Sequence, residues 1–364
     1  MSGVRAEESQ RRLASLRRRL ADLDLDGMMV SALENIRYLS GFSGSLAYLV
    51  ISADAAEMLA DSRYWLQVEA EAPGFALVRT AASSGVFPLL AERVNGLGLR
   101  RVGFEAAHLT VDHHQRLLEA LPKEVALHPT TGLIEELRII KTAEEIELLR
   151  RVASIAGRAF DRVRSAIRPG LRERDVAFLL EQTFQELGAD GIAFESIVAA
   201  GERGAQPHGR ASDRVIERSD MIVIDFGARA GGYHSDTTRT VVVGQPSAEQ
   251  SRVIDAVRRA QEESMQLMRP GIPANQVDEK ARQVLAGESH AFAHGLGHGI
   301  GLAVHERPFL SATDQTQLQA GMVITNEPGI YVPGWGGVRL EEMVLITDSG
   351  PQVLTPASKE VAVS

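Results

Sequence analysis

Hydrophobic and polar positions in the first third of the chain alternate between strand and helix patterns. Short apolar runs typical of strands lie at residues 27–30, 47–51 and 101–104, and a helical spacing covers residues 112–121. Such alternation predicts an α/β domain, in which helices cover a sheet. The pattern ends near Pro129. We therefore expect one α/β domain over residues 1–130 and a second domain over residues 131–364.

The second part of the chain contains an internal repeat. Residues 142–145 form a capping-box sequence ahead of an amphipathic helical pattern. The sequence Arg-Pro-Gly-Leu at 168–171 recurs 101 residues later as Arg-Pro-Gly-Ile at 269–272, and each copy separates two helical patterns. The same offset carries the strand-like residues 221–225 onto 322–326. We therefore expect an α+β domain built from two related halves about a pseudo-twofold axis.

The first half contains a predicted hairpin that carries two acidic residues. Asp225 and Asp236 lie equally far from the centre of residues 230–231, so a hairpin that turns there would place the two side chains directly opposite each other. Opposed residues on an antiparallel pair have Cβ atoms about 4.5–5.5 Å apart, and like charges at that distance destabilise the pairing. A divalent cation between the carboxylates would remove the conflict.

The second half offers another pair of acids in an equivalent place. Glu327 and Glu341 are symmetric about Gly334 in a second predicted hairpin. If the two halves pack about a pseudo-twofold axis, four carboxylates converge, and bridging carboxylates can hold two metal ions about 3.5–4 Å apart. Periodicity leaves open whether Glu341 or its neighbour Glu342 points into this cluster.

Histidines beside glycine-rich or acidic motifs are candidate imidazole partners for these carboxylates. Residues 294–301 read HGLGHGIG, and the glycines make a helix costly at about 1 kcal/mol each. We expect a strand or turn instead, in which alternation places His294 and His298 on the same side. The glycines leave the opposite side bare, as is typical where another backbone or a substrate approaches closely. His208 and His305 lie beside similar motifs.

Composition and charge narrow the function further. A formal net charge of −9 and a pI near 5.7 argue against binding to nucleic acid or anionic membranes, because both need a basic surface. The chain has no cysteine, so a metal must be held by oxygen and imidazole. No apolar run approaches the ~20 residues of a membrane span, and no signal-peptide core is present. The cytoplasm is the expected location.

In combination, the motifs resemble those of one group of metal-dependent peptidases. The matching stretches are PHG at 207–209, IDFGA at 224–228, SDTTRT at 235–240, HGLGHGIG at 294–301, VHE at 304–306, NEPGIY at 326–331 and VRLEE at 338–342. This set resembles the pita-bread metallopeptidases, which include prolidases, aminopeptidase P and methionine aminopeptidase. NIRYLSGFSG at 35–44 and DSRYW at 61–65 resemble the creatinase-type N-terminal domain of the proline-specific branch, which methionine aminopeptidases lack.

The resemblance implies a creatinase-like α/β domain followed by an α+β pita-bread catalytic domain with a pseudo-twofold repeat. It implies that two divalent metal ions are held by Asp225, Asp236, His298, Glu327 and Glu341, and it thereby selects Glu341 over its neighbour. Mn²⁺ is the expected ion, with Co²⁺ and Zn²⁺ as alternatives. Creatinase shares the fold but lacks the metal-binding acids, all of which are present in this chain.

The resemblance also implies roles for side chains around the metal ions. A hydroxide held between the ions would attack the scissile carbonyl, and Glu327 would carry its proton towards the leaving amine. His305 would stabilise the tetrahedral oxyanion. His208 would lie close to the scissile bond, and His294 would line the substrate pocket.

Arg339 and Tyr331 are candidates for orienting the metal-binding carboxylates. Arg339 lies two residues before Glu341 and projects to the same face of a strand. A charged hydrogen bond from Arg339 to a ligand carboxylate would hold that carboxylate in place, whereas a salt bridge elsewhere is the alternative. Tyr331 either does similar orienting work or packs in the core.

The implied substrates are small peptides with an Xaa-Pro bond. That bond is a tertiary amide without an N–H, and peptidases that hydrogen-bond this N–H cannot position it. The chain length and the short spacings between the implied ligands resemble those of compact microbial prolidases, and small bacterial aminopeptidases P share them; of the two, we favour an Xaa-Pro dipeptidase. The alternative is an aminopeptidase P that acts on longer Xaa-Pro peptides, and a non-catalytic binding module is a remote one. A homodimer formed through the N-terminal domain is also expected.

Overall fold

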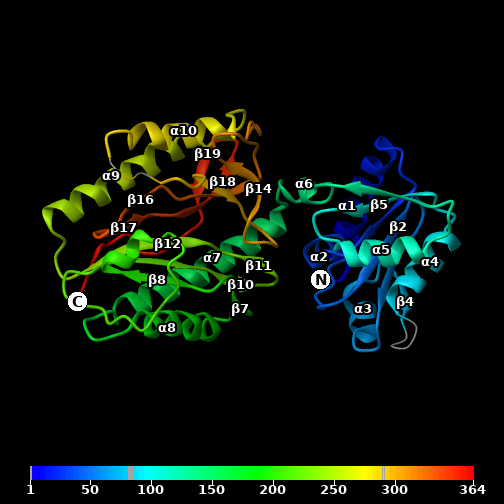
Figure 1. Cartoon of the computed structure of the whole chain (residues 1–364), viewed down its shortest axis with the longest axis horizontal. Helices are drawn as coiled ribbons and strands as arrows, with labels where there is room; N and C mark the ends of the chain where they lie inside the picture. The colour runs from blue at the N-terminus through cyan, green and yellow to red at the C-terminus, as the bar shows by residue number, and fades with distance from the viewer. Residues whose placement is uncertain (1, 81–84, 289, 291) are drawn as a thin grey trace. The chain divides into compact units, whose positions relative to one another are not determined.

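The chain forms two compact units, Met1–Arg138 and Ile139–Ser364. The structure is a computed structural model that describes residues 2–80, 85–288, 290 and 292–364. Figure 1 shows the helices and strands of both units, and many of them are labelled in chain order. In the described part of the chain, no helix combines enough length with enough apolar residues to cross a membrane.

The first unit is a mixed six-stranded sheet with helices packed on it. Its strands are β1 (Gly27–Val30), β2 (Tyr48–Ser52), β3 (Ala56–Ala60), β4 (Ala76–Arg79), β5 (Arg101–Glu105) and β6 (Ala126–Thr130), in the sheet order β4-β3-β2-β1-β5-β6. Its helices are α1 (Ser2–Asp22), α2 (Leu33–Ser40), α3 (Trp65–Glu71), α4 (Val86–Gly96), α5 (Val111–Ala120) and α6 (Glu135–Arg138). The predicted α/β character of this part is confirmed.

The first unit extends past the last strand of its sheet. Helix α6 follows β6, and the buried Arg138 at its end donates a hydrogen bond to Asn35 Oδ1 at 2.8 Å. Asn35 in turn donates to Glu105 and Glu135, at 2.7 Å in each case. Because this network ties α6 to the sheet, we propose a domain boundary after Arg138 rather than at residue 130.

The long helices of the second unit repeat as two pairs. The first pair is α7 (Ala143–Arg164) and α8 (Glu173–Glu186), and the second is α9 (Ala248–Met265) and α10 (Ala274–Val284). Thr142 caps α7 in the predicted capping box with Glu145. The loops within the pairs contain Gly170 and Gly271, whose φ values of 95° and 86° favour glycine. The predicted duplication of helix, Pro-Gly loop and helix is confirmed.

The strands of the second unit form two larger sheets, β20-β12-β9-β8 and β14-β13-β15-β18-β19, and two smaller ones, β11-β10-β7 and β16-β17. The strands are β7 (Gly191–Ile192), β8 (Ile197–Ala200), β9 (Met221–Phe226), β10 (Ala228–Ala230), β11 (Tyr233–His234), β12 (Thr237–Val243), β13 (Gly297–Gly299), β14 (Glu306–Leu310), β15 (Val323–Asn326), β16 (Gly329–Val332), β17 (Gly336–Arg339), β18 (Glu342–Thr347), β19 (Gly350–Val353) and β20 (Ala362–Val363). Helix α8 packs on one side of these strands, and α9 and α10 pack on the other (Figure 1).

Aromatic packing behind β9 determines where its acidic residue points. Phe226 stacks on Phe160 of α7, with ring centroids 5.1 Å apart, and its ring centroid lies 6.5 Å from that of Phe184 of α8. All three phenylalanines are buried. Because successive residues of a strand point to opposite faces, the packing of Phe226 against the helices directs Asp225 away from them.

The register of the first acidic hairpin differs from the prediction. Asp225 in β9 lies opposite Thr238 in β12, so the prediction that Asp225 and Asp236 face each other directly is wrong. Asp236 is instead a diagonal neighbour on the same face. The turn is formed by Gly231-Gly232, both with positive φ, because a two-residue hairpin turn with two positive φ values favours glycine at both positions. Ala230, at the predicted centre, belongs to strand β10.

The register of the second acidic hairpin agrees with the prediction. Strands β16 and β17 pair symmetrically about Gly334. Strands β15 and β18 continue the same register, with Asn326 opposite Glu342. Glu327 and Glu341 lie between the two paired segments, so they face each other across the hairpin as predicted.

Candidate metal centre

A cavity of about 960 Å³ lies within the second unit. Most of the candidate site residues line it, namely His208, Asp225, Asp236, His294, His298, His305, Glu327, Arg339 and Glu341. Tyr331 contacts this group through His294 and Arg339. The structure therefore brings together side chains from both halves of the repeat.

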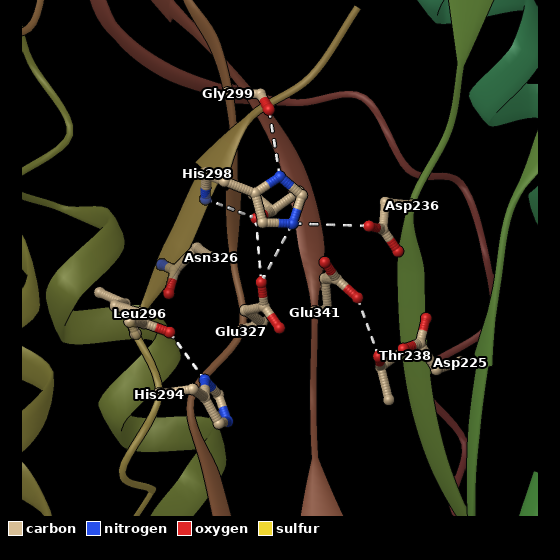
Figure 2. A network of polar contacts seen from close by, with 12 residues as sticks. Asp225, Asp236, Thr238, His294, Leu296, His298, Gly299, Asn326, Glu327 and Glu341 are labelled. Carbon is tan, nitrogen blue, oxygen red and sulfur yellow. Dashed lines mark hydrogen bonds and ion pairs between the residues drawn. The ribbon is translucent and has the colours of Figure 1, made fainter. Parts of the chain in front are cut away.

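The acidic side chains and one histidine converge at the base of the cavity. Asp225 lies in β9 and Asp236 directly precedes β12, whereas the two glutamates lie between the paired segments of the second hairpin. Figure 2 shows these side chains pointing toward one another from opposing strands. The donor atoms of Asp236, His298 and Glu341 all lie within 4.8 Å of one another.

Without a bound cation, the ionised forms of the carboxylates in this cluster are disfavoured. Burial, together with the charges of Glu341 and Asp225, raises the pKa of Asp236 well above its usual range. Burial, together with the charges of Glu327 and Asp225, does the same to the pKa of Glu341. Burial raises the pKa of Glu327 to about 8. A bound cation would favour the ionised forms and reverse these shifts.

His298 turns an unprotonated nitrogen towards the carboxylates. Burial, and then the neighbouring His305, lower the pKa of His298 to about 4, so its ring is neutral near pH 7. Its Nδ1 lies 3.1 Å from Gly299 O and must donate there, which leaves a lone pair on Nε2. Nε2 lies 3.6 Å from Asp236 Oδ2 and 3.4 Å from Glu327 Oε1. These contacts are not ion pairs, and a cation between the atoms would satisfy all of them.

The donor set fits a divalent metal ion. In the part of the chain that the structure describes, Asp225 Oδ1, Asp236 Oδ1 and Glu341 Oε1 are buried without a hydrogen-bond partner. Buried polar atoms are rarely left in this state. Carboxylate and imidazole donors without thiolates suit ions such as Mn²⁺, Co²⁺ and Zn²⁺. The residues present can therefore hold the metal ions that the sequence predicts.

The structure distinguishes the two adjacent glutamates after β17. Glu341 lines the cavity, and its Oε2 accepts a hydrogen bond from Thr238 at 2.8 Å. Glu342 is fully buried on the other face, where Arg239 lies 3.1 Å and Lys359 2.9 Å from its Oε1. Glu342 is thus neutralised by two cationic side chains, and Glu341 is the member of the pair that joins the cluster.

Arg339 links the carboxylate cluster to the cavity wall. Its Nη2 donates to Asp225 Oδ2 at 2.7 Å, its Nε to Thr238 Oγ1 at 3.0 Å and its Nη1 to Tyr331 Oη at 2.9 Å. The predicted hydrogen bond from Arg339 to a carboxylate of the cluster is present. Thr238 was not identified from the sequence as a member of this network. Its side chain shares a sheet face with that of Asp225, because the two residues lie directly opposite each other.

Tyr331 connects Arg339 to His294. Burial raises the pKa of Tyr331 to about 12, so its hydroxyl stays protonated and can donate to His294 Nε2 at 2.9 Å. Burial lowers the pKa of His294, which keeps Nε2 an acceptor while Nδ1 donates to Gly295 O at 2.7 Å. The phenol is therefore part of a polar network rather than of simple packing.

The glycine-rich segment forms a short strand, as predicted. It contains β13 (Gly297–Gly299), which lies between β14 and β15. A Cβ added at Gly297 would collide with Thr325 O, and one at Gly299 would collide with Arg307 O. The predicted close approach of another backbone is thus confirmed. His305 follows this strand, and its ring centroid lies 4.3 Å from that of His298.

Replacing Arg339 by lysine is expected to lower kcat/KM about 10–100-fold, the usual effect of losing a residue that orients a metal ligand. A lysine ammonium cannot donate to Asp225, Thr238 and Tyr331 at once, as the planar guanidinium does. Steady-state kinetics together with bound-metal analysis measure the effect. Arg252→Lys, at an exposed pair with Glu288, is the control that should retain full activity. Wild-type kinetics in Arg339→Lys would show that the guanidinium geometry is dispensable.

The duplicated domain and its acidic cavity define a metallopeptidase of the pita-bread fold. The chain belongs to metallopeptidase family M24, which matches residues 147–348, and residues 12–140 match the creatinase/prolidase N-terminal domain. The predicted family is therefore confirmed, and with it the two-domain fold.

Three relatives illustrate the likeness. The Xaa-Pro dipeptidase of Pyrococcus horikoshii is 36% identical over 93% of this chain and 94% of that protein. The structure of the Xaa-Pro dipeptidase from Bacillus anthracis is 36% identical, with a TM-score of 0.94 over 98% of this chain and 100% of that one. The structure of the X-Pro aminopeptidase from Thermotoga maritima is 35% identical, with a TM-score of 0.87 over 95% and 100%.

Proposed function

We propose that this chain is a metal-dependent exopeptidase that hydrolyses Xaa-Pro dipeptides. The observation that carries the proposal is the buried cluster of carboxylates around His298, in which three carboxylate oxygens have no hydrogen-bond partner among the described residues. Family membership supports metal-dependent peptide hydrolysis. The dipeptidases of Pyrococcus horikoshii and Bacillus anthracis, each similar over nearly the whole chain, support the dipeptide as substrate.

Two divalent metal ions would be held by Asp225, Asp236, His298, Glu327 and Glu341, with Mn²⁺ as the first candidate and Co²⁺ or Zn²⁺ as alternatives. When bound, such ions polarise a carbonyl and lower the pKa of water, and so they supply a nucleophile at neutral pH. The presence of both oxygen and imidazole donors supports this assignment. The cavity volume of about 960 Å³ is within the range of small-molecule sites.

The other cavity residues position the substrate and move protons. Glu327 is oriented by a 3.3 Å hydrogen bond from Thr325 Oγ1, and we assign it the transfer of a proton to the leaving proline nitrogen. His305 donates a hydrogen bond to the carbonyl oxygen as negative charge develops there. His208 lies near the leaving nitrogen, and His294, held by Tyr331, lines the pocket.

Activity on Ala-Pro and on the tripeptide Ala-Pro-Ala tests the proposed substrate. We expect hydrolysis of Ala-Pro with kcat/KM at least about tenfold above that of the tripeptide, which corresponds to ~1.4 kcal/mol. Gly-Ala serves as the control dipeptide without proline. A preference for the tripeptide would favour the aminopeptidase alternative, to which the Thermotoga maritima structure gives support. A metal-free protein with no turnover would indicate a binding module.

Two further features stay predictions from the sequence resemblance. One is a homodimer formed through the N-terminal unit, which analytical ultracentrifugation tests. The other is a cytoplasmic location, which cell fractionation tests.

A further inference from the structure

An ion pair is buried in the second unit outside the metal-binding cluster. Lys141 Nζ lies 3.0 Å from Glu306 Oε2, and the two side chains are 2% and 6% exposed. Taking two charges out of water costs free energy that good geometry and further hydrogen bonds must offset. Neither residue lines the cavity, so the pair needs a different explanation.

Glu306 shapes the turn that ends at His305. Its Oε1 accepts a hydrogen bond from Ala303 N at 3.0 Å. Its carboxylate lies against Gly301, where an added Cβ would be 2.7 Å from Oε2. Glu306 is the first residue of β14 and is buried, whereas His305, directly before the strand, is exposed and lines the cavity. The carboxylate therefore holds this turn from its buried side.

Lys141 is itself anchored by the backbone. Its N–H donates to Gly321 O at 2.9 Å. The next residue, Thr142, is the N-cap of α7 and is held in a capping box. The ammonium therefore reaches Glu306, 165 residues later in the chain, from a well-fixed point.

We propose that Lys141 is a positioning residue that sets the place of His305 in the cavity. The Lys141 ammonium holds the Glu306 carboxylate, and that carboxylate holds Ala303 N–H and the turn. This turn then places the His305 ring against the ring of His298. Without the ammonium, the buried carboxylate loses a cationic partner at 3.0 Å, which is unfavourable, and its position beside the Ala303 N–H shifts. The proposal rests on the function proposed above for His305.

Lys141→Met tests this role, because methionine keeps the length of the side chain and removes the charge. We expect kcat for Ala-Pro to fall about tenfold or more, since small misplacements of a catalytic group are costly. KM should change less than about twofold, because His305 acts on charge that develops in the transition state. Lys280→Met is the matched control, since Lys280 forms a partly exposed pair with Glu263 at 2.7 Å, and its kcat should not change.

A double-mutant cycle with His305→Ala separates positioning from general structural support. If Lys141 acts through His305, Lys141→Met lowers kcat by less than about twofold in the His305→Ala background. An equal loss in both backgrounds overturns the proposal, as does the absence of any loss in the wild-type background.

Chemical labelling gives a readout that does not depend on the substrate. Diethyl pyrocarbonate modifies imidazoles. His305 is already exposed, so its labelling rate reports the surroundings of the ring as well as its access to reagent, and we expect that rate to change about threefold or more in Lys141→Met, as the turn is displaced. The exposed His108 of the first unit is the internal reference in the mass spectrum. Unchanged labelling of His305 would contradict the positioning role, whereas a lack of turnover of Ala-Pro by the wild type would contradict the proposed function.

A second variant covers the case in which Lys141→Met does not fold. Lys141→Met with Glu306→Leu removes both charges of this pair together with the acceptor for the Ala303 N–H. We expect the same loss of kcat in the wild-type background and the same small effect in the His305→Ala background. Full activity of this neutral pair would overturn the proposal.

Discussion

Replacing Asp236 by asparagine is expected to lower kcat/KM for Ala-Pro by roughly 10³-fold. The substitution keeps the size of the side chain but removes an anionic donor from the group that Asp236 forms with His298 and Glu341. An amide oxygen is a weaker ligand for a divalent ion than a carboxylate. Bound metal, measured by mass spectrometry of the dialysed protein, should therefore fall together with activity.

The same substitution is expected to stabilise the metal-free protein. Burial and the charges of Glu341 and Asp225 raise the pKa of Asp236 well above its usual range. A carboxyl group whose ionised form is disfavoured in the folded state opposes folding near neutral pH when no cation is bound. Asparagine carries no charge, so the Tm of the chelated variant should exceed that of the chelated wild type by ~2–4 °C for each kcal/mol gained.

Asp255→Asn is the matched control for both effects. Asp255 pairs with Arg258 on the surface at 2.6 Å, and exposed pairs of this kind contribute about 0–1 kcal/mol. Neither activity nor the Tm of the chelated protein should change in this variant. Full activity of Asp236→Asn would show that Asp236 is not a metal ligand. A lower Tm for the chelated variant than for the chelated wild type would contradict the claim that the charge of Asp236 destabilises the metal-free protein.

Local signals in the sequence were sufficient to predict the register of the second hairpin and the two helix pairs. The symmetry of Glu327 and Glu341 about Gly334 matches the observed register. The Pro-Gly loops of both copies carry a glycine with positive φ at the same offset. These features depend on turn and capping chemistry over a few residues, which the sequence displays directly.

Features that depend on distant partners could not be predicted in this way. The turn predicted for the first hairpin at residues 230–231 is one residue too early, since the pairing of Asp225 with Thr238 places it at 231–232. The choice between Glu341 and Glu342 depends on Arg239, a residue of another strand. Periodicity predicts which side chains point to the same face of a strand, but it does not identify the residues that pack against that face.

Buried acids that support the cavity histidines also escaped sequence reasoning. Glu173 accepts hydrogen bonds from Arg203 and Ser212, on either side of the loop that carries His208. Asp278 accepts one from Leu296 N, two residues after His294 in the sequence. Such acids stabilise the segments next to these histidines with hydrogen bonds from backbone and side-chain donors, and nothing in their immediate sequence distinguishes them from surface acids.

Removal of the metal ions is expected to abolish hydrolysis and to lower the Tm of the protein. A ligand that binds the folded state at 100 times its Kd adds ~2.7 kcal/mol to the free energy of unfolding, which corresponds to about 5–10 °C for a domain of this size. Chelation followed by dialysis, with activity and melting measured before and after, tests both effects. Re-addition of Mn²⁺, Co²⁺ or Zn²⁺ in separate samples should restore both, and the most effective ion identifies the preferred metal.

The stability of the metal-free protein should depend on pH in a defined direction. Burial raises the pKa of Glu327 from an ordinary value of 4.5 to about 8, so the folded state binds more protons than the unfolded state between these two values. The free energy of unfolding contributed by this group is therefore present at low pH and is lost as the pH rises through the folded pKa. The Tm of the chelated protein should fall from about pH 5 to pH 8.

The difference in Tm between metal-loaded and chelated protein should consequently widen as the pH rises across this window. Metal ions need deprotonated ligands, so they bind most strongly where the metal-free cluster is least stable. In Asp236→Asn the difference should shrink at every pH, because the variant has both a weaker site and less repulsion to relieve. A chelated wild type that gains stability from pH 5 to pH 8, or an equal difference in the two proteins, would show that the carboxylates are not held together by the cations.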